Sequence, residues 1–476
     1  MNNPNESAGV SRGPRFLNVS SEKCRKIHNA SLEILDRVGA RLFFEDAVEL
    51  LKKAGANVSD GNLVRMGPHL VDRALETVPK TVDLHDRNGN LVMPLDGSRS
   101  YYGPGSDCLN LIDFRTGERR KPVLSDLADG CTLCDALPHV DFVMSMVLPT
   151  DVDEAHADRH QMEAMLSYST KPIIYVTYEL DGCVDAVAMA EAVRGSADAL
   201  SKEPFIACYI NAISGLQHNR EALQKLMFLA EKNLPSLYIP CSTAAMSSPV
   251  TPAGAVALDY AGVLLGLVIS QLVREGSPVV VLGLPQGTFD MRTMVTSYCE
   301  PERILPQVMA HHYGLPMFAI GGVSEAKLSD QQAAAEAAMS LAVETFSGSH
   351  IIHDMGYLES GLTFSFEQLL LCNEIVSWLK AYGSEIEVSD ESIAVDLIAE
   401  LGPDGDFLNT DHTLKRYTKR WYPTNFERAN YETWVGRAAM SFSDRARERI
   451  EEILSQHEPH PLDAGTKERL AEIVSR

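Results

Sequence analysis

Apolar and polar positions follow one another in a repeating order along the middle of the chain. Between Pro138 and Gly356, a short apolar run is followed by a polar stretch and then by a longer segment with helical spacing. Continuous apolar strands that alternate with helices are typical of a parallel sheet covered on both faces. The seven apolar runs are FVMSMVLPTD, PIIYVTYE, PFIACYINAIS, PSLYIPCST, PVVVLGLPQG, PMFAIGGVSE and HIIHDMG.

The starts of these runs support their interpretation as strands. Five of them open with proline, which lacks an N–H group and is tolerated at the first residue of a strand. Seven units without a reversal of the pattern predict an α/β fold with a closed (β/α)8 TIM barrel rather than an open doubly wound sheet. The region after Cys372 is the candidate for the eighth strand. The five prolines are Pro172, Pro204, Pro235, Pro278 and Pro316.

Two further segments flank the predicted barrel. Residues 1–137 begin with helical patterns and continue with a hairpin-like pattern, in which RNGN is a strong two-residue turn signal. Residues 381–476 are charged and helical near their end. The sequence therefore predicts three parts: a helical and β-hairpin extension packed on the barrel (1–137), the barrel core (138–380) and a C-terminal helical segment that completes and covers the barrel (381–476).

The composition limits the partners of the chain. A net charge of -23 and a pI near 5.0 disfavour nucleic acid as a partner, because phosphate binding needs clustered Lys and Arg. The most apolar window, AGVLLGLVIS, is shorter than the roughly 20 residues of a membrane span and predicts a buried helix. A polar N-terminus without an apolar region, together with nine scattered cysteines, predicts a cytoplasmic protein with reduced thiols.

The polar residues that follow each apolar run are the candidate site residues, because catalytic groups of a parallel barrel lie at the carboxyl ends of its strands. These positions lack HExxH, paired CxxC, GxGxxG and GxSxG patterns, so zinc, dinucleotide and nucleophile-elbow sites have little support. The one CxxC motif, Cys131 to Cys134, lies in a helical pattern and is interpreted as two half-buried thiols. The candidates are Asp151, Tyr178, Glu179, Tyr209, Asn211, Cys241, Thr243, Gln286, Phe289, Ser324, Glu325, Lys327, His353, Asp354 and Tyr357.

Some of these positions have both a structural and a functional interpretation. A lysine at Lys327 could form a Schiff base with a carbonyl substrate, but it lies several residues beyond the apolar run MFAI and is expected to face solvent. His353 is either a core histidine or an orienting hydrogen-bond donor, and its place at a strand end favours function. Tyr101 and Tyr102 either pack in a hairpin or cap the barrel and offer aromatic faces to a cationic ligand.

Three separated segments carry a resemblance to a known family. They are SYYGPGSDCLNLIDFRTGERRKPVLSDLAD, GGVSEAKLSDQQAAAEAAMSLAVETFSGSHIIHDMGYLESGLTFSFEQLLLCNEI and GPDGDFLNTDHTLKRYTKRWYPTNF. In this order they resemble the trimethylamine methyltransferase family of corrinoid-dependent enzymes, and the likeness extends through nearly the whole chain. The resemblance implies a TIM barrel. The trimethylamine enzymes of the family hold pyrrolysine, whereas this sequence contains only the twenty standard residues. It therefore resembles the branch without pyrrolysine, which includes glycine betaine:corrinoid methyltransferases.

The resemblance also implies a reaction and a set of partners. A methyl group would pass from a quaternary amine, with glycine betaine as the donor and dimethylglycine as the product, to the cobalt(I) of a corrinoid (cobalamin) held by a separate protein. No metal would bind to the chain itself, and a homo-oligomer is expected. A betaine site needs aromatic faces around the ammonium and a hydrogen-bond donor for the carboxylate. The expected cage is Tyr102, Tyr209 and Phe289, and the expected carboxylate partners are His353 and Gln286.

The expected catalytic residues are His353 and Glu325, and the expected contacts with the corrinoid are Gly321, Gly322 and Ser324. Two alternatives remain open beside this assignment. One is a Schiff-base lyase or aldolase on the same barrel, which would use Lys327. The other is a betaine-binding protein without catalytic activity.

Overall fold

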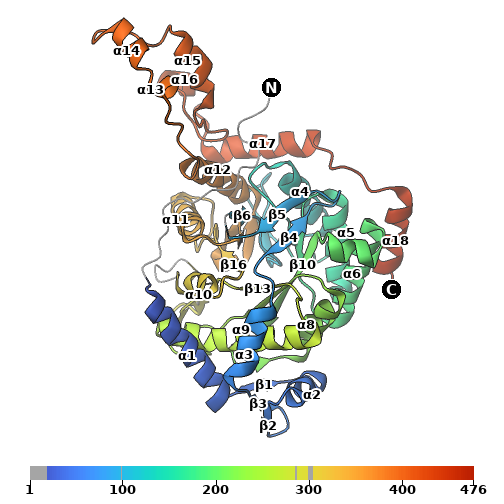
Figure 1. The fold of residues 1–476 in the computed structure, drawn as a ribbon. Helices are drawn as coiled ribbons and strands as arrows, with labels where there is room; N and C mark the ends of the chain where they lie inside the picture. Colours follow the sequence, from blue (N-terminus) through green and yellow to red (C-terminus); the bar gives the residue numbers. More distant parts are fainter. Residues whose placement is uncertain (1–18, 98, 285–286, 299–303) are drawn as a thin grey trace.

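A barrel of parallel strands lies at the centre of the molecule, and helices surround it (Figure 1). The computed structural model describes residues 19–97, 99–284, 287–298 and 304–476. Seven strands form a continuous parallel sheet, because each strand pairs in parallel with its neighbour. Their order is β6 (Tyr101–Tyr102), β17 (Ile351–His353), β16 (Met317–Ile320), β13 (Val279–Leu282), β12 (Ser236–Pro240), β10 (Ile206–Ala212) and β9 (Ile173–Tyr175).

The barrel closes through a short segment between β9 and β6. Val143 forms a parallel bridge with Ile173 of β9. On the other side, the backbone N–H of Asp141 donates to the carbonyl of Tyr102 over 2.6 Å. Residues 141–143 therefore act as the remaining strand of an eight-stranded barrel, which confirms the predicted fold class.

The expected position of the eighth strand is wrong. The region around Cys372 is helical, as part of α12 (Phe366–Tyr382), and the missing strand is β6. The two residues of β6 precede the sequence GPGS, so no apolar run marks them as a strand. This strand lies within residues 1–137, the segment predicted as an extension of the barrel.

The helices around the barrel follow the strands in sequence. The longest described helix, α9, is mostly apolar and has the length and composition of a membrane span, but 83% of its most apolar window is buried inside the protein. It is therefore a core helix, as the sequence predicts. The surrounding helices are α4 (Leu124–Ala136), α5 (Ala157–Tyr168), α6 (Leu180–Arg194), α7 (Ala197–Lys202), α8 (Arg220–Lys232), α9 (Pro252–Val273), α10 (Leu305–Tyr313), α11 (Gln331–Ser347) and α12.

The first part of the chain packs against the outside of the barrel, mainly on α9. Helices α1 (Ser21–Arg37) and α3 (Pro68–Thr77) pack against α9. The hairpin of β4 (Val82–His85) and β5 (Leu91–Leu95) is bound to the barrel where the N–H of His85 donates to the carbonyl of Pro204, just before β10. The remaining elements here are α2 (Glu45–Lys53), β1 (Ala40–Leu42), β2 (Asn57–Ser59), β3 (Leu63–Arg65) and β11 (Gln217–His218).

Loops at the carboxyl end of the barrel carry a second, smaller set of elements. A four-stranded sheet joins two distant parts of the chain, because β7 pairs with β19. A two-stranded hairpin, β14 with β15, follows β13. The elements are β7 (Asn110–Ile112), β8 (Arg119–Arg120), β18 (Tyr357–Leu358), β19 (Thr363–Ser365), β14 (Phe289–Asp290), β15 (Val295–Thr296) and the 3-10 turns η1 (Glu154–His156) and η2 (Glu359–Gly361).

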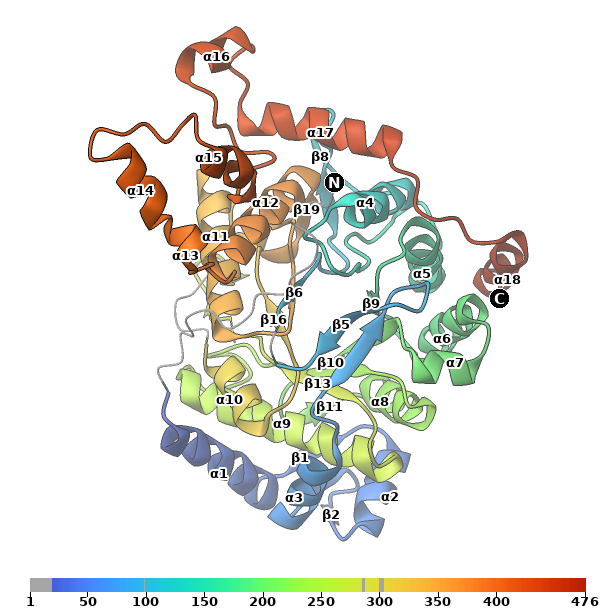
Figure 2. The same ribbon diagram turned by 45° about the horizontal axis from the view of Figure 1, so that its top comes forward.

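The last part of the chain divides into an arm and two covering helices. Residues 384–440, called the arm below, extend away from the barrel (Figures 1 and 2). The arm holds α13 (Asp390–Ile393), α14 (Val395–Leu401), α15 (Asp411–Arg416), η3 (Tyr417–Lys419) and α16 (Tyr431–Gly436). The chain then returns, and α17 (Phe442–Gln456) packs on α12 and α4 while α18 (Ala464–Val474) packs on α5 and α6.

The cysteines behave as core residues. The eight cysteines in the described part of the chain are all free thiols. Cys131 and Cys134 of the CxxC motif are buried in α4, and burial raises the pKa of Cys134 to about 12. A thiol with such a pKa is protonated and unreactive at neutral pH. The motif is therefore part of the packing of α4.

Candidate active site

Three aromatic side chains from three strands meet inside the barrel. Residues that are paired across parallel strands point to the same side of a sheet, and the pairing places Tyr209, Phe318 and His353 on one common face. The ring of Tyr209 lies 4.9 Å from the ring of Phe318 and 6.0 Å from that of His353, although β10 is not adjacent to β16 or β17. The contact therefore crosses the interior, and the common face is the inner one.

His353 is fixed at the carboxyl end of β17 in one tautomer. Its ring stacks on Phe318 with centroids 3.8 Å apart, and its Nδ1 donates a hydrogen bond to the carbonyl of Ala319 over 2.7 Å. Burial lowers the pKa of His353 to about 3, so the imidazole is neutral at physiological pH. The proton therefore lies on Nδ1, and Nε2 has a lone pair but no hydrogen to donate.

Asp354 lies beside this imidazole in a strained backbone conformation. Its Oδ1 is 3.4 Å from Nε2 of His353, which is not an ion pair because the imidazole is neutral. Asp354 has a φ of 82°, a value that side-chain-bearing residues rarely adopt, and it is 7% exposed. Strain of this kind persists where the surrounding structure enforces it. A Cβ atom on Gly105 would lie 2.1 Å from Oδ1 of Asp354, so glycine is required at this contact.

A second carboxylate in a left-handed conformation follows β6. Asp107 has a φ of 62° and accepts hydrogen bonds from Oγ of Ser145 and Nε2 of Gln161, over 2.8 and 2.9 Å. Burial raises its pKa despite these two bonds. The charges of Asp107 and Asp354 both act on Tyr357, whose pKa is raised mainly by burial. The mouth of the barrel is therefore electronegative and rich in tyrosine.

Glu325 joins two loops at the rim of the barrel. Its Oε1 accepts hydrogen bonds from Oγ of Ser297 over 2.5 Å and from the backbone N–H of Tyr298 over 3.1 Å. Burial raises the pKa of Tyr298 to about 12, and the charge of Asp354 contributes to that shift. Tyr298 is thus a neutral phenol near the same carboxylate as His353. Glu325 holds the segment after β15 against the loop after β16.

The structure places the predicted cage residues in different surroundings. Tyr209 belongs to the inner group. Tyr102 is fully buried on the outer face of β6, where its hydroxyl bonds to Oγ1 of Thr345 in α11 over 2.8 Å. Side chains alternate along a strand, so Tyr101 takes the inner face and its neighbour takes the outer one. Phe289 is half-buried in β14. Gln286 lies outside the described residues.

The three residues expected to contact the corrinoid are packed against protein atoms. A Cβ on Gly321 would lie 2.7 Å from Cγ2 of Ile352. Gly322 has a φ of 91°, and a Cβ atom on it would lie 3.1 Å from Met355. Ser324 is fully buried, and its hydroxyl donates to Oε2 of Glu336 over 2.6 Å. Internal packing therefore accounts for the small side chains in this segment.

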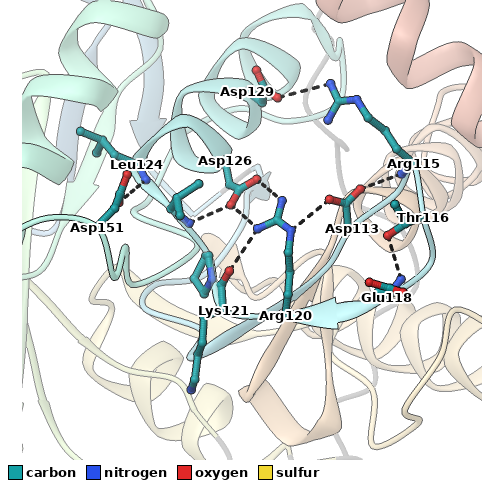
Figure 3. Close-up of polar contacts among 12 residues, drawn as sticks. Asp113, Arg115, Thr116, Glu118, Arg120, Lys121, Leu124, Asp126, Asp129 and Asp151 are labelled. Carbon is teal, nitrogen blue, oxygen red and sulfur yellow. Dashed lines mark hydrogen bonds and ion pairs between the residues drawn. The ribbon is translucent and has the colours of Figure 1, made fainter.

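Two other candidates have structural surroundings. Lys327 is exposed, and its Nζ donates to the backbone carbonyl of Glu325 over 2.7 Å, outside the inner group. Oδ1 of Asp151 accepts from the backbone N–H of Leu124 at the start of α4 over 2.8 Å. Figure 3 shows this contact beside a network in which Arg120 binds the carboxylates of Asp113 and Asp126. The network fixes the β7–β8 hairpin to α4.

Three residues near the site are not among the candidates predicted from the sequence. Phe318 lies in the middle of an apolar run, which predicts a core residue, but its ring stacks on that of His353. Tyr298 follows a hairpin that no periodicity marks. Asp107 lies in the motif YYGPGSD, where the two glycines indicate an unusual backbone. Among the described residues, no group of three or more His, Cys, Asp or Glu side chains is arranged to hold a metal ion.

Fold and site together define a class: an α/β-barrel protein whose polar and aromatic groups converge at the carboxyl ends of the parallel strands. The family model described as trimethylamine methyltransferase (MTTB) matches residues 3–476. The chain therefore belongs to the trimethylamine methyltransferase family and is a methyltransferase.

Individual relatives cover the chain from end to end. The trimethylamine methyltransferase MttB of Desulfitobacterium hafniense (strain DSM 10664 / DCB-2) is 29% identical, over 98% of this chain and 95% of the relative. The glycine betaine methyltransferase of Desulfitobacterium hafniense (strain Y51) is 26% identical, over 97% of each. Among solved structures, the hydroxylamine MtmB complex matches with a TM-score of 0.51 and 13% identity, over 92% of this chain and 89% of that one. This last likeness concerns the fold.

Proposed function

We propose that the protein transfers a methyl group from glycine betaine to the cobalt(I) of a corrinoid carried by a separate protein. A bond would form between cobalt and the methyl carbon while the carbon–nitrogen bond breaks. The electron pair of that bond stays on nitrogen, which becomes the neutral tertiary amine of the dimethylglycine carboxylate. The observation that carries the proposal is the inner group of Tyr209, Phe318 and neutral His353, next to Asp354. An electronegative, aromatic environment favours a quaternary ammonium.

The absence of pyrrolysine supports a quaternary donor over trimethylamine. The nitrogen of a tertiary amine must be protonated or otherwise activated before it can leave. A quaternary ammonium already carries the positive charge that makes the amine a leaving group. The barrel can therefore serve this reaction with standard residues, by orienting the methyl group and excluding water. The corrinoid supplies the nucleophile, and the chain needs no general acid.

The tautomer of His353 changes the role that we assign to it. Because Nδ1 donates to Ala319, Nε2 of the neutral ring is an acceptor and cannot donate to a substrate carboxylate. We assign the contact with the betaine carboxylate to the amide of Asn211. This residue lies at the end of β10, two positions after Tyr209 on the same inner face, and it is exposed at the mouth. His353 and Asp354 then face the ammonium.

The proposal is tested by anaerobic methyl transfer to free cob(I)alamin, followed by visible spectroscopy. We expect methylation of the corrinoid with glycine betaine and formation of dimethylglycine. Transfer from another quaternary amine alone would keep the reaction and replace the donor. Transfer from no donor would contradict the proposal.

The assignment of Asn211 has its own test. Replacing it (Asn211→Ala) should raise KM for glycine betaine by a factor of about 10 to 150, because one hydrogen bond to a charged group is worth roughly 1.5–3 kcal/mol. Choline lacks the carboxylate, so any activity with choline should not change. An equal loss with both donors would show that Asn211 has a general structural role instead.

A further inference from the structure

Tyr298 comes from a segment outside the barrel strands, yet its phenol lies among groups of the barrel mouth. It follows the β14–β15 hairpin, is half-buried and packs against the main hydrophobic core. Burial raises the pKa of Tyr298 to about 12, and the neighbouring Asp354 and Cys241 raise it further. Electrostatic effects of this kind act over short distances, so the phenol lies near both groups.

The pairing of β10 with β12 shows which wall of the mouth these groups belong to. Tyr209 pairs with Leu237, and both therefore lie on the inner face. Side chains alternate along a strand, so Cys241, four positions after Leu237, shares that face. Burial is the main cause of the raised pKa of Tyr209, and Cys241, Asp354 and Tyr298 raise it further. The two tyrosines and Asp354 therefore share one part of the mouth.

Hydrogen bonds fix the segment that carries Tyr298. Oε1 of Glu325 accepts from Oγ of Ser297 over 2.5 Å and from the backbone N–H of Tyr298 over 3.1 Å. The backbone N–H of Ser297 donates to the carbonyl of Thr288, just before β14, over 3.1 Å. The segment is thus bonded both to its own hairpin and to the loop after β16. These bonds set the point from which the ring of Tyr298 extends.

Glu325 is itself held by neighbouring elements. Its backbone N–H donates to Oε2 of Glu336 in α11 over 2.8 Å. The backbone N–H of the preceding Ser324 donates to the carbonyl of Tyr357 in β18 over 2.9 Å. A side chain on such a support can hold another residue with little freedom of movement. Its carboxylate engages the next loop, which is a structural connection and not a proton transfer.

An aromatic ring at this place suits a quaternary ammonium. Such a cation has no N–H group, so aromatic faces and negative charge recognise it in place of hydrogen bonds. Phe318 and His353 stack on each other and supply one aromatic platform. Tyr102, one of the expected cage residues, is fully buried with its hydroxyl on α11 and cannot supply another. Tyr298, with a neutral phenol beside Asp354, can.

We propose that Tyr298 forms a wall of the pocket for the quaternary ammonium and that Glu325 is the positioning residue that holds this wall in place. The inference rests on the proposed function, because it names residues that select the methyl donor at the same site. It divides recognition between two elements. Asn211 of β10 contacts the carboxylate, and the segment after the β14–β15 hairpin contacts the cationic end.

The first test compares the binding of two probes to the full chain without corrinoid, by calorimetry. Glycine betaine and 3,3-dimethylbutyrate have the same shape and carboxylate, but the second has carbon in place of the charged nitrogen. The preference for betaine is the ratio of the two Kd values. Tyr298→Leu should lower this preference about 3- to 30-fold, because the contact of one ring with the cation is lost. Tyr298→Phe keeps the aromatic face and should keep the preference.

The matched control is Tyr168→Leu, which alters a tyrosine at the end of α5 that is 44% exposed. It should leave both Kd values unchanged. An unchanged preference in a folded Tyr298→Leu protein that still binds betaine would overturn the inference and leave the proposed function standing. Failure of the wild-type chain to bind betaine would contradict the proposed donor and this pocket together.

The second test separates positioning from a direct role of the Glu325 charge. Glu325→Ala should lower the preference for betaine as far as Tyr298→Leu does. Glu325→Gln should retain it, because the amide oxygen can accept the same two hydrogen bonds. The double variant should lose no more than Tyr298→Leu alone, since both changes act through one ring. Equal losses in Glu325→Gln and Glu325→Ala, or additive losses in the double variant, would overturn the positioning role.

Discussion

The barrel and the arm differ in how they bury apolar side chains. In the barrel, the inner and outer faces of the strands are covered by other side chains of the same chain, and α9 alone contributes sixteen buried residues. In the arm, α13 to α16 contribute none. The barrel therefore completes its own core, whereas the arm leaves its large apolar side chains exposed. The difference separates side chains that complete a folded core from side chains that remain on the surface.

The sharpest contrast is expected between two leucines. Leu264 of α9 is fully buried, whereas Leu408 of the arm is 74% exposed. Leu264→Ala should lower the free energy of unfolding by about 3–5 kcal/mol, because it leaves a cavity in a packed core. Leu408→Ala should change the stability of the protomer by less than about 0.5 kcal/mol. Denaturant unfolding followed by the fluorescence of the native tryptophans measures both. A comparable loss for Leu408 would show that the arm is part of the folding core.

The next largest expected effect is a loss of activity when His353 is replaced. His353→Ala removes the stacking partner of Phe318 and the acceptor beside Asp354. We expect kcat/KM for methyl transfer to fall about 100-fold, which corresponds to ~2.7 kcal/mol. His412→Ala in the arm serves as the control and should leave kcat/KM unchanged. Unchanged activity in a folded His353→Ala protein would remove His353 from the site.

The sequence predicted the barrel more reliably than the site, and the reason is physical. Seven of the eight strands are marked by apolar runs, since strands buried on both faces need apolar residues throughout. The eighth strand, β6, is not marked by an apolar run. Its two residues are enough to pair with β17 because both neighbouring segments supply backbone partners. Such a short strand has no periodicity to detect.

The inner aromatic group was only partly predictable for a related reason. Tyr209 and His353 lie near strand ends, where polar residues are predicted to be candidate site residues. Which of Tyr101 and Tyr102 faces inward depends on the register of β6 against β17, and that register is a property of the folded sheet. The side on which His353 carries its proton depends on the carbonyl of Ala319, from another strand. Neither feature is encoded locally.

Ion pairs provide a smaller contrast between barrel and arm. Arg120 bridges Asp113 and Asp126, and the side chain of Asp126 is only 7% exposed (Figure 3). Arg120→Ala should cost about 2 kcal/mol of stability, because it leaves the buried carboxylate with fewer partners. Arg416→Ala in the arm breaks contacts with two exposed glutamates and should cost less than about 1 kcal/mol. Thermal unfolding of the two variants ranks them, and the reverse order would contradict this account.

At neutral pH the smallest effect comes from the buried histidines, which affect stability only when the pH is lowered. Burial lowers the pKa of His139 and of His218 to about 4, from an ordinary value near 6.5. Between these values the unfolded chain binds a proton that the folded chain does not bind. Stability should therefore fall as the pH is lowered from about 6.5 to about 4, by at most ~1.4 kcal/mol per pH unit for each histidine.

The substitution His139→Gln isolates one of these contributions. Glutamine does not titrate, so the variant should lose stability less steeply than the wild type between pH 6.5 and pH 5, whatever the substitution does to stability at pH 7. Chemical denaturation at several pH values gives the two slopes directly. Equal slopes would mean that His139 binds its proton in the folded state as readily as in the unfolded state, and that the loop around it opens to water. Because residues 141–143 close the barrel directly after this histidine, the comparison also reports how firmly the barrel is closed at that seam.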